Sequence, residues 1–447
     1  MTLIHQLMEG NNTNSDDPHR AVHPGLFLTQ EAEMEDHKPG HCAVDFPVSA
    51  VLPAGGSGER VGLQTPKQFC TLLGRPLISY TIQAFERVSW IQNIVVVVSK
   101  ENMDLMMDII QRFQHRKIRV VPGGSTRHRS IANGVQALVE GDDRLAADRP
   151  EVVIIHDAVR PFVDEDFLYK IAMAAKKQGA AGAIRPLVST VIARTLEGYL
   201  DQSLERAKYR ASEMPQGFTY DVISQAYLRC TESDFEFGTE CLHLALQYCG
   251  INAKLIEGPP TLWKVTYKQD LAAAESIVKD ALSRSACIIT GGSTRASVLA
   301  DALQKALGAL DMKLDVIPDL LGDNARYLLK EWNFIQVSVD HPCISELEAI
   351  LTALEVTDRA LLYPLVIILV HLSDTDGLSI IGKMAEAAAI MKLASSAKLR
   401  NFLIYGVQIH QSKDAKHWET SVSRVAEITS ALIRERSPAL VGQLLQT

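Results

Sequence analysis

Short apolar runs alternate with amphipathic stretches along most of this chain of 447 residues. Four apolar runs predict strands that are covered on both faces: 48–52, 94–98, 118–121 and 152–155. The stretches between them predict helices, at 76–87, 101–113 and 125–138. Strands separated by helices of this length imply βαβ units and a mostly parallel sheet. Ligands of such sheets bind beyond the carboxyl ends of the strands.

The pattern divides the chain into three parts. Residues 1–45 are polar and show little periodicity, so we expect a disordered tail. Residues 46–283 form the first α/β domain, and the alternation restarts in 284–447, which predicts a second, Rossmann-like α/β domain. The second domain opens with I-I-T-G-G-S-T-R, which lacks the third glycine of a dinucleotide-binding loop. Packing or dimer contacts are therefore favoured over cofactor binding there.

The composition and net charge limit which kinds of partner the chain is expected to bind. The chain is 47% hydrophobic and 22% charged, with a formal net charge of −8, which argues against a broad nucleic-acid or anionic-membrane surface. No apolar run reaches the ~20 residues that a membrane span requires. Seven cysteines without a paired C-x-x-C pattern indicate a reducing compartment, and we expect the cytosol. We expect neither nucleic acid nor a membrane as a partner.

A glycine-rich segment directly follows the first strand. It reads L-P-A-G-G-S-G-E-R, and P-K-Q-F follows a few residues later. Gly55, Gly56 and Gly58 let the backbone approach a ligand closely, and successive amides in such a turn form an anion site. Arg60 and Lys67 add two cations. The segment predicts a polyphosphate site, although a plain tight turn is the alternative interpretation.

Two further polar segments also follow strands and should reach the same edge of the sheet. In H-D-A-V-R-P, Asp157 is either a turn former or a carboxylate that holds a sugar hydroxyl or helps to place Mg²⁺, and we favour the second role. Arg160 is either a structural partner of Asp157 or a substrate group, and both interpretations stay open. In P-G-G-S-T-R-H-R-S, Ser130 lies in the first turns of a helix, where amides and hydroxyls meet a nucleobase or phosphate.

These segments together resemble a known family. The glycine-rich segment with P-K-Q-F resembles the signature of sugar-phosphate nucleotidyltransferases, and the P-K-Q variant resembles their methylerythritol-phosphate cytidylyltransferase branch. The G-G-x-x-R-x-x-S pattern and W-K-V-T at 263–266 fit the same family, so the resemblance covers about 47–283. It implies an enzyme that transfers CMP from CTP to a polyol phosphate and releases pyrophosphate. It also implies Mg²⁺ held mainly by the CTP phosphates, and a β-arm at 186–217 that crosses to a second subunit of a homodimer.

The resemblance also assigns roles to residues. It implies catalytic roles for Arg60, Lys67, Arg206 and Lys264. It implies substrate-binding roles for Ala54, Gly55, Gly56, Gly58, Gly124, Ser130, Asp157, Arg160 and Thr190. No residue is assigned as a direct ligand of the metal.

The acceptor is identified by resemblance alone. Met214 stands where the family has a threonine. This change, the tail and the second domain resemble the vertebrate D-ribitol-5-phosphate branch, which makes CDP-ribitol for O-mannosyl glycans of dystroglycan. Methylerythritol phosphate as the acceptor and a non-catalytic scaffold are the alternatives.

Overall fold

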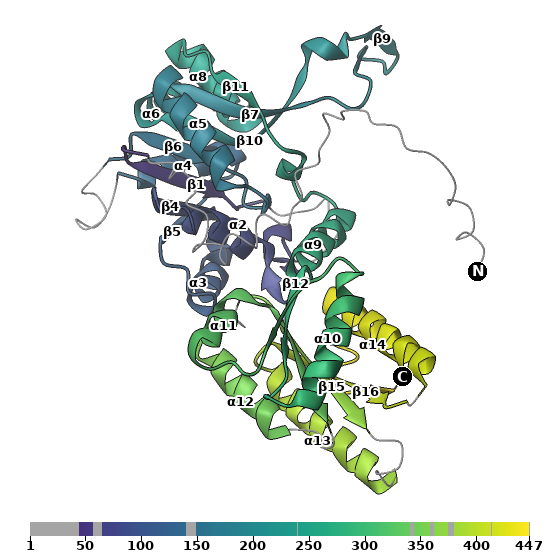
Figure 1. Cartoon of the computed structure of the whole chain (residues 1–447). Helices are drawn as coiled ribbons and strands as arrows, with labels where there is room; N and C mark the ends of the chain where they lie inside the picture. Colours follow the sequence, from purple (N-terminus) through teal and green to yellow (C-terminus); the bar gives the residue numbers. More distant parts are fainter. Residues whose placement is uncertain are drawn as a thin grey trace.

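The chain forms two α/β domains, each built on one large sheet (Figure 1). The computed structural model describes residues 44–56, 65–139, 149–238, 240–339, 344–357, 362–373, 380–412 and 414–446. The predicted architecture, an α/β domain with a β-arm followed by a second doubly wound α/β domain, is confirmed. The predicted tail at 1–45 lies almost wholly outside the described residues.

The first sheet has seven strands. In spatial order they are β11 (Lys254–Glu257), β7 (Ala180–Pro186), β10 (Arg210–Thr219), β6 (Val152–Ile155), β1 (Val48–Pro53), β4 (Ile91–Val98) and β5 (Ile118–Pro122). Strand β10 runs antiparallel to both of its neighbours, and the other pairs are parallel. The central strands are apolar on both faces because helices cover both. The mostly parallel sheet was therefore predicted correctly, but the antiparallel strand was not.

Helices pack on both faces of this sheet. One face is covered by α2 (Leu77–Glu86), α3 (Met103–Arg112) and α5 (Glu165–Gln178). The other is covered by α4 (Arg127–Ala137), α6 (Tyr220–Arg229) and α8 (Cys241–Cys249). The predicted helix bounds at 76–87 and 101–113 differ from those of α2 and α3 by one or two residues at each end.

A hairpin projects from the first domain. Its strands are β8 (Ile192–Arg194) and β9 (Leu200–Ser203), and Figure 1 shows it extending away from the sheet. The hairpin carries large apolar side chains that contact little of their own chain: Val188 is 87% exposed and Leu196 is 99% exposed. This is the region where the β-arm was predicted.

The second sheet has six strands, all parallel. In spatial order they are β13 (Lys313–Ile317), β12 (Ser285–Ile289), β14 (Asn333–Val339), β15 (Leu365–Ser373), β16 (Phe402–His410) and β17 (Leu444–Gln446). The helices that cover it are α10 (Thr294–Gly308) and α14 (Ala415–Glu435) on one face, and α12 (Ile344–Glu355) and α13 (Ile380–Lys398) on the other. Helix α14 and strand β17 complete this domain at its C-terminal end.

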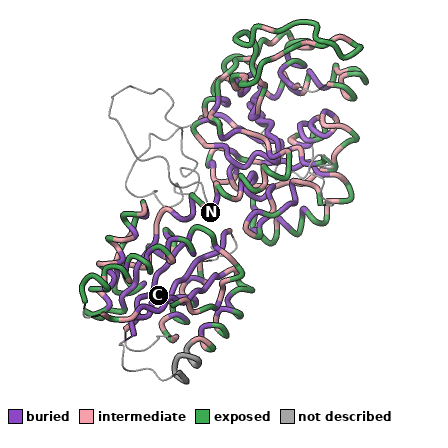
Figure 2. Tube along the Cα trace, turned by 90° about the vertical axis from the view of Figure 1, so that its right-hand side faces the viewer, coloured by how far each residue is buried: buried purple, intermediate pink, exposed green. Residues whose placement is uncertain are grey.

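Helix α9 (Lys268–Leu282) connects the domains and lies where they meet (Figure 1). Buried residues run through the centres of both domains (Figure 2). Within the described part of the chain, none of the helices is both long and apolar enough to cross a membrane.

Gly134 tests how tightly α4 packs on the sheet. A Cβ atom at this position would lie 2.5 Å from Cγ1 of Val51 and 2.8 Å from Cγ2 of Val97. We expect Gly134→Ala to lower the free energy of unfolding by about 1–3 kcal/mol, because the added methyl overpacks the contact with β1 and β4. Differential scanning calorimetry would record this as a lower melting temperature.

Gly308, in the last turn of α10, is the matched control. A Cβ atom there meets no other atom within 4 Å. Gly308→Ala should leave the melting temperature unchanged or raise it, since alanine is favoured over glycine in a helix by up to ~1 kcal/mol. A Gly134→Ala protein that melts as the Gly308→Ala protein does would contradict the packing argument.

Candidate active site

A buried glutamine bonds the backbone at the start of the glycine-rich segment. Gln68 is 2% exposed, and its side-chain amide donates to the carbonyl oxygens of Ala54 at 2.7 Å and Gly56 at 3.0 Å. It belongs to a 3-10 turn, Lys67–Phe69, which also brings Lys67 to the same cavity. The turn therefore fixes the start of the glycine-rich segment and a cation together.

Gly58, predicted to bind substrate, and Arg60, predicted to be catalytic, lie outside the described residues. Their predicted roles stay predictions.

The N-terminus of α4 lines another side of the same cavity. Thr126 caps the helix, with its hydroxyl accepting from the Arg129 amide, and the Ser130 hydroxyl accepts from the Gly124 amide at 3.2 Å. A Cβ atom at Gly124 would lie 2.4 Å from the Cβ of Arg129, so only glycine fits in this turn. The turn leaves polar groups and the positive end of a helix facing the cavity.

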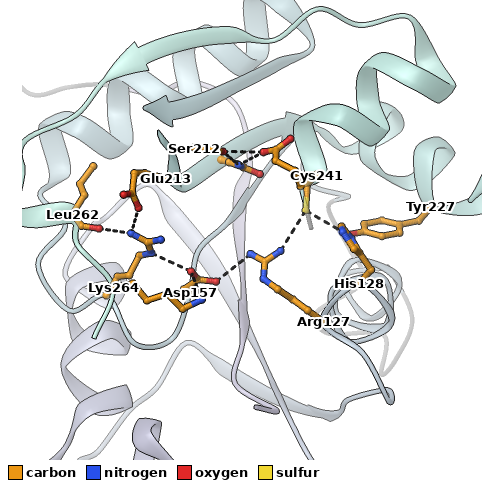
Figure 3. Close-up of polar contacts among 12 residues, drawn as sticks. Arg127, His128, Asp157, Ser212, Glu213, Tyr227, Cys241, Leu262 and Lys264 are labelled. Atoms are coloured by element: carbon orange, nitrogen blue, oxygen red, sulfur yellow. Dashed lines mark hydrogen bonds and ion pairs between the residues drawn. The ribbon is translucent and has the colours of Figure 1, made fainter. Parts of the chain in front are cut away.

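Asp157 lies at the centre of the site and contacts three cations (Figure 3). Its Oδ1 is 3.1 Å from Arg127, and its Oδ2 is 3.0 Å from both Arg160 and Lys264. Burial alone would raise the pKa of Asp157, but Arg127, Lys264 and Arg160 together hold it well below its ordinary value of 3.8. Asp157 is therefore ionised whenever the protein is folded near neutral pH.

Arg160 acts as a structural partner in this arrangement. It is 7% exposed, and besides Asp157 it contacts the Glu213 carboxylate and the carbonyl oxygen of Leu262. These contacts tie the segment of Asp157 to β10 and to the segment before Lys264. Arg160 is not among the residues that line the cavity, so the structure favours the first of the two interpretations left open by the sequence.

The segments meet around one cavity of about 340 Å³. Eight of the predicted site residues line it: Ala54, Gly55, Gly56, Lys67, Gly124, Ser130, Asp157 and Lys264. They come from four separate segments of the chain, each following a strand of the first sheet. The cavity is large enough for part of a nucleotide, and both Lys67 and Lys264 line it.

Thr190 and Arg206 lie elsewhere. Both are exposed and belong to the region of the projecting hairpin, and neither lines the cavity of its own chain. The side chain of Arg206 donates to the carbonyl oxygen of Val188 within the hairpin. Met214, where the family has threonine, is buried on β10 and does not line this cavity either.

Sequence reasoning missed three residues that shape the site: Arg127, Gln68 and Thr266. Arg127 was visible as the arginine of the G-G-x-x-R-x-x-S pattern, but nothing in the sequence showed that it would pair with Asp157, thirty positions away. Burial alone would lower the pKa of Arg127, and the Asp157 carboxylate beside it raises that pKa instead. On its other side, Arg127 approaches the buried thiol of Cys241, which also contacts the Tyr227 hydroxyl (Figure 3).

Comparisons with known proteins agree with this geometry. A model of the 2-C-methyl-D-erythritol 4-phosphate cytidylyltransferase family matches residues 48–280, and a model of the D-ribitol-5-phosphate cytidylyltransferase C-terminal domain matches residues 284–426. The D-ribitol-5-phosphate cytidylyltransferase of Mus musculus is 51% identical over 401 residues, which is 89% of this chain and 90% of that protein. The protein of the same name from Xenopus tropicalis is 51% identical over 412 residues, 91% of this chain and 98% of its own length. The chain belongs to the D-ribitol-5-phosphate cytidylyltransferase family.

Members of this family are nucleotidyltransferases, and the first domain is the part shared with bacterial enzymes. The 2-C-methyl-D-erythritol 4-phosphate cytidylyltransferase of Syntrophus aciditrophicus is 35% identical over 234 residues, which is 52% of this chain and 96% of that protein. A crystal structure of 4-diphosphocytidyl-2C-methyl-D-erythritol synthase from Anaerococcus prevotii gives a TM-score of 0.44 at 26% identity, covering 52% of this chain and 96% of that one.

Two buried histidines beside the site make stability depend on pH. His128 contacts the Tyr227 hydroxyl, and His156 contacts the carbonyl oxygen of Arg160 at 2.9 Å. Burial lowers the pKa of each to about 4, below the ordinary value of 6.5. The unfolded chain therefore binds more protons between pH 6.5 and 4, and acidification through this window favours unfolding.

We expect the free energy of unfolding to fall between pH 6.5 and 4, by up to ~1.4 kcal/mol per pH unit for each histidine. Above about pH 7 these two groups should add no pH dependence. His128→Gln should lose one of the two contributions, so its stability should fall less steeply. Urea titrations at pH 7.5, 6 and 5 measure the slopes, and equal slopes in both proteins would contradict the assignment.

Proposed function

We propose that this chain transfers CMP from CTP to D-ribitol 5-phosphate and releases pyrophosphate, giving CDP-ribitol. The observation that supports this most directly is that a glycine-rich segment, Lys67, Lys264 and Asp157 all line one cavity. The identity of about 50% to D-ribitol-5-phosphate cytidylyltransferases over about 90% of the chain supports the choice of acceptor. CDP-ribitol would then serve as a donor for O-mannosyl glycans.

In the proposed reaction, a phosphate oxygen of ribitol 5-phosphate attacks the α-phosphorus of CTP. A new phosphorus–oxygen bond forms, the bond from the α-phosphorus to the bridging oxygen breaks, and pyrophosphate leaves with the electron pair. No covalent intermediate on the protein is needed, so the protein must position two polyanions and stabilise the charge on the transferring phosphorus.

The residues that line the cavity suit these tasks. Amides of the segment at Gly55 and Gly56 would hold the triphosphate, and Gly124 and Ser130 at the start of α4 would contact the cytosine. Lys67, together with Arg60, would stabilise the transition state and the leaving pyrophosphate. Lys264 keeps 31% of its side chain exposed beside Asp157, so it remains accessible to the acceptor phosphate.

The donor set indicates how Mg²⁺ would be held. Among the cavity residues that the structure describes, Asp157 is the sole carboxylate, and both of its oxygens already contact cations. Mg²⁺ prefers several oxygen ligands, so the CTP phosphates and water would supply most of them. The ion, when bound, neutralises charge on the triphosphate.

We propose further that the enzyme is a homodimer joined through the projecting hairpin. Leu196, Tyr199 and Leu200 are 99%, 74% and 66% exposed, which is unfavourable for apolar side chains unless a partner covers them. Arg206 and Thr190 lie in the same region, so dimerisation would bring them to the acceptor site of the partner. Of the seven cysteines, the five that the structure describes are all free, which supports a cytosolic location.

Product analysis tests the proposed reaction. The purified protein, CTP and Mg²⁺ are incubated with D-ribitol 5-phosphate, other pentitol phosphates or 2-C-methyl-D-erythritol 4-phosphate, and products are identified by mass spectrometry. We expect CDP-ribitol and pyrophosphate in equal amounts, with ribitol 5-phosphate as the preferred acceptor. Preference for methylerythritol phosphate would make the bacterial activity correct instead, and the absence of any CDP product would indicate a non-catalytic protein.

Complementation tests the shared site. Lys67→Ala and Arg206→Ala should each lower kcat by roughly a hundredfold, because each removes a cation from the reacting phosphates. In an equimolar mixture, half of the dimers would be mixed, and one of their two sites would keep both cations. The mixture should therefore recover about a quarter of wild-type activity.

Lys100→Ala is the matched control, because Lys100 is exposed and does not line the cavity. Its activity should equal that of the wild type. A mixture that stays as inactive as its two components would show that each site uses residues of one chain.

A further inference from the structure

The segments that carry the proposed catalytic groups share a core with the C-terminal domain. Leu72 follows Lys67, Val159 follows Asp157, and Val265 follows Lys264, and all three side chains are buried in one apolar cluster. The amide of Val265 donates to the carbonyl oxygen of Val159 at 3.0 Å, which joins two of these segments directly. The same cluster continues into the second sheet, through Cys287, Ile289, Phe334, Leu365 and Ile367.

An aromatic contact joins the C-terminal domain to helix α2 of the first domain, near the segment of Lys67. Tyr363, from the segment before β15, is 3% exposed, and its ring centroid lies 5.7 Å from that of Tyr80 on α2. Trp332 packs edge-on against the same ring, with centroids 4.9 Å apart. The hydroxyl of Tyr80 in turn donates to the carbonyl oxygen of Leu72 at 2.7 Å. Tyr363 therefore contacts Tyr80, and Tyr80 bonds the backbone of Leu72, five residues after Lys67.

A buried arginine depends on the same aromatic ring. Arg75 is 1% exposed, and its guanidinium donates to the hydroxyl and carbonyl of Ser79 and to Gln83. Among the described residues, Arg75 has no ion-pair partner. Its guanidinium carbon instead lies 4.9, 5.4 and 5.8 Å from the ring centroids of Tyr80, Phe113 and Tyr363. Cation–π contacts of this kind compensate for a buried charge, so Tyr363 helps to stabilise Arg75 in place.

Arg75 and Leu72 belong to one short hairpin, β2 (Thr71–Leu72) and β3 (Arg75–Pro76). This hairpin directly follows the turn of Lys67 and Gln68, and the Leu77 amide donates back to the Cys70 carbonyl at 2.9 Å. A shift of the hairpin would therefore move both Lys67 and the glutamine that holds the glycine-rich segment.

We propose that the C-terminal domain positions the catalytic segments, and that Tyr363 is the positioning residue for Lys67. This inference rests on the proposed cytidylyl transfer and adds a role for the second domain to it. The physical reason is that a transition-state cation must be held to within a fraction of an ångström, and rigid packing behind it supplies that restraint. The contact is made by a side chain that belongs to neither the nucleotide cavity nor its domain.

The experiment compares full-length variants in steady-state assays with CTP and ribitol 5-phosphate. Tyr363→Ala should lower kcat by on the order of tenfold, with a smaller change in KM for the acceptor, because Lys67 is displaced while Lys264 is not. Tyr363→Phe keeps the ring and should restore kcat to within about threefold of the wild type. If Tyr363→Ala does not fold, Tyr363→Leu replaces it and should show the same loss of kcat.

Val422→Ala is the matched control. Val422 is 5% exposed on α14 and packs in a separate core on the opposite face of the second sheet. It should lower the melting temperature, as any large-to-small core change does, yet leave kcat close to the wild type. If Tyr363→Ala and Val422→Ala have equal kcat, the positioning role is wrong. If the wild type itself forms no CDP-ribitol, the proposed function fails first, so the two failures are distinguishable.

Discussion

The site depends on one buried carboxylate whose negative charge offsets the positive charges of three side chains. Asp157 contacts Arg127 at the start of α4, Lys264 after β11, and Arg160, which reaches β10. Breaking a buried ion pair by removing one partner typically costs ~3–5 kcal/mol, because the remaining charges stay buried and unpaired. Asp157 therefore fixes the relative positions of segments that are far apart in the sequence.

The same charge arrangement suits a cavity that must accept and release polyanions. Three cations without a counter-charge would repel one another while the cavity contains no ligand. Asp157 removes much of that repulsion, and Arg127 and Lys264 still keep 29% and 31% of their side chains exposed. A bound phosphate would then compete with Asp157 for cations that are already oriented, so little reorganisation would be needed on binding.

Local patterns in the sequence predicted most of the fold. Apolar runs such as 48–52 and 94–98 became β1 and β4 because both faces of those strands are buried. The roles of the glycine-rich segment and Lys67 could be predicted because a close backbone approach requires glycine, and a phosphate site requires a cation. The pairing of Arg127 with Asp157 and the support of Ala54 by Gln68 could not, because both depend on which strands become neighbours in the sheet. The contact of Tyr363 with Tyr80 spans nearly three hundred positions and leaves no periodic signal.

The shared core has a consequence for whether the two halves of the chain could exist separately. The Syntrophus aciditrophicus relative matches only 52% of this chain but 96% of its own length, so it has almost no residues left to form a second sheet. In this chain, Leu72, Tyr80 and Val159 lie in an interior shared with the second domain, and separating the halves would expose an apolar face to water. The first domain of this chain would therefore need polar substitutions on this face to persist alone in water.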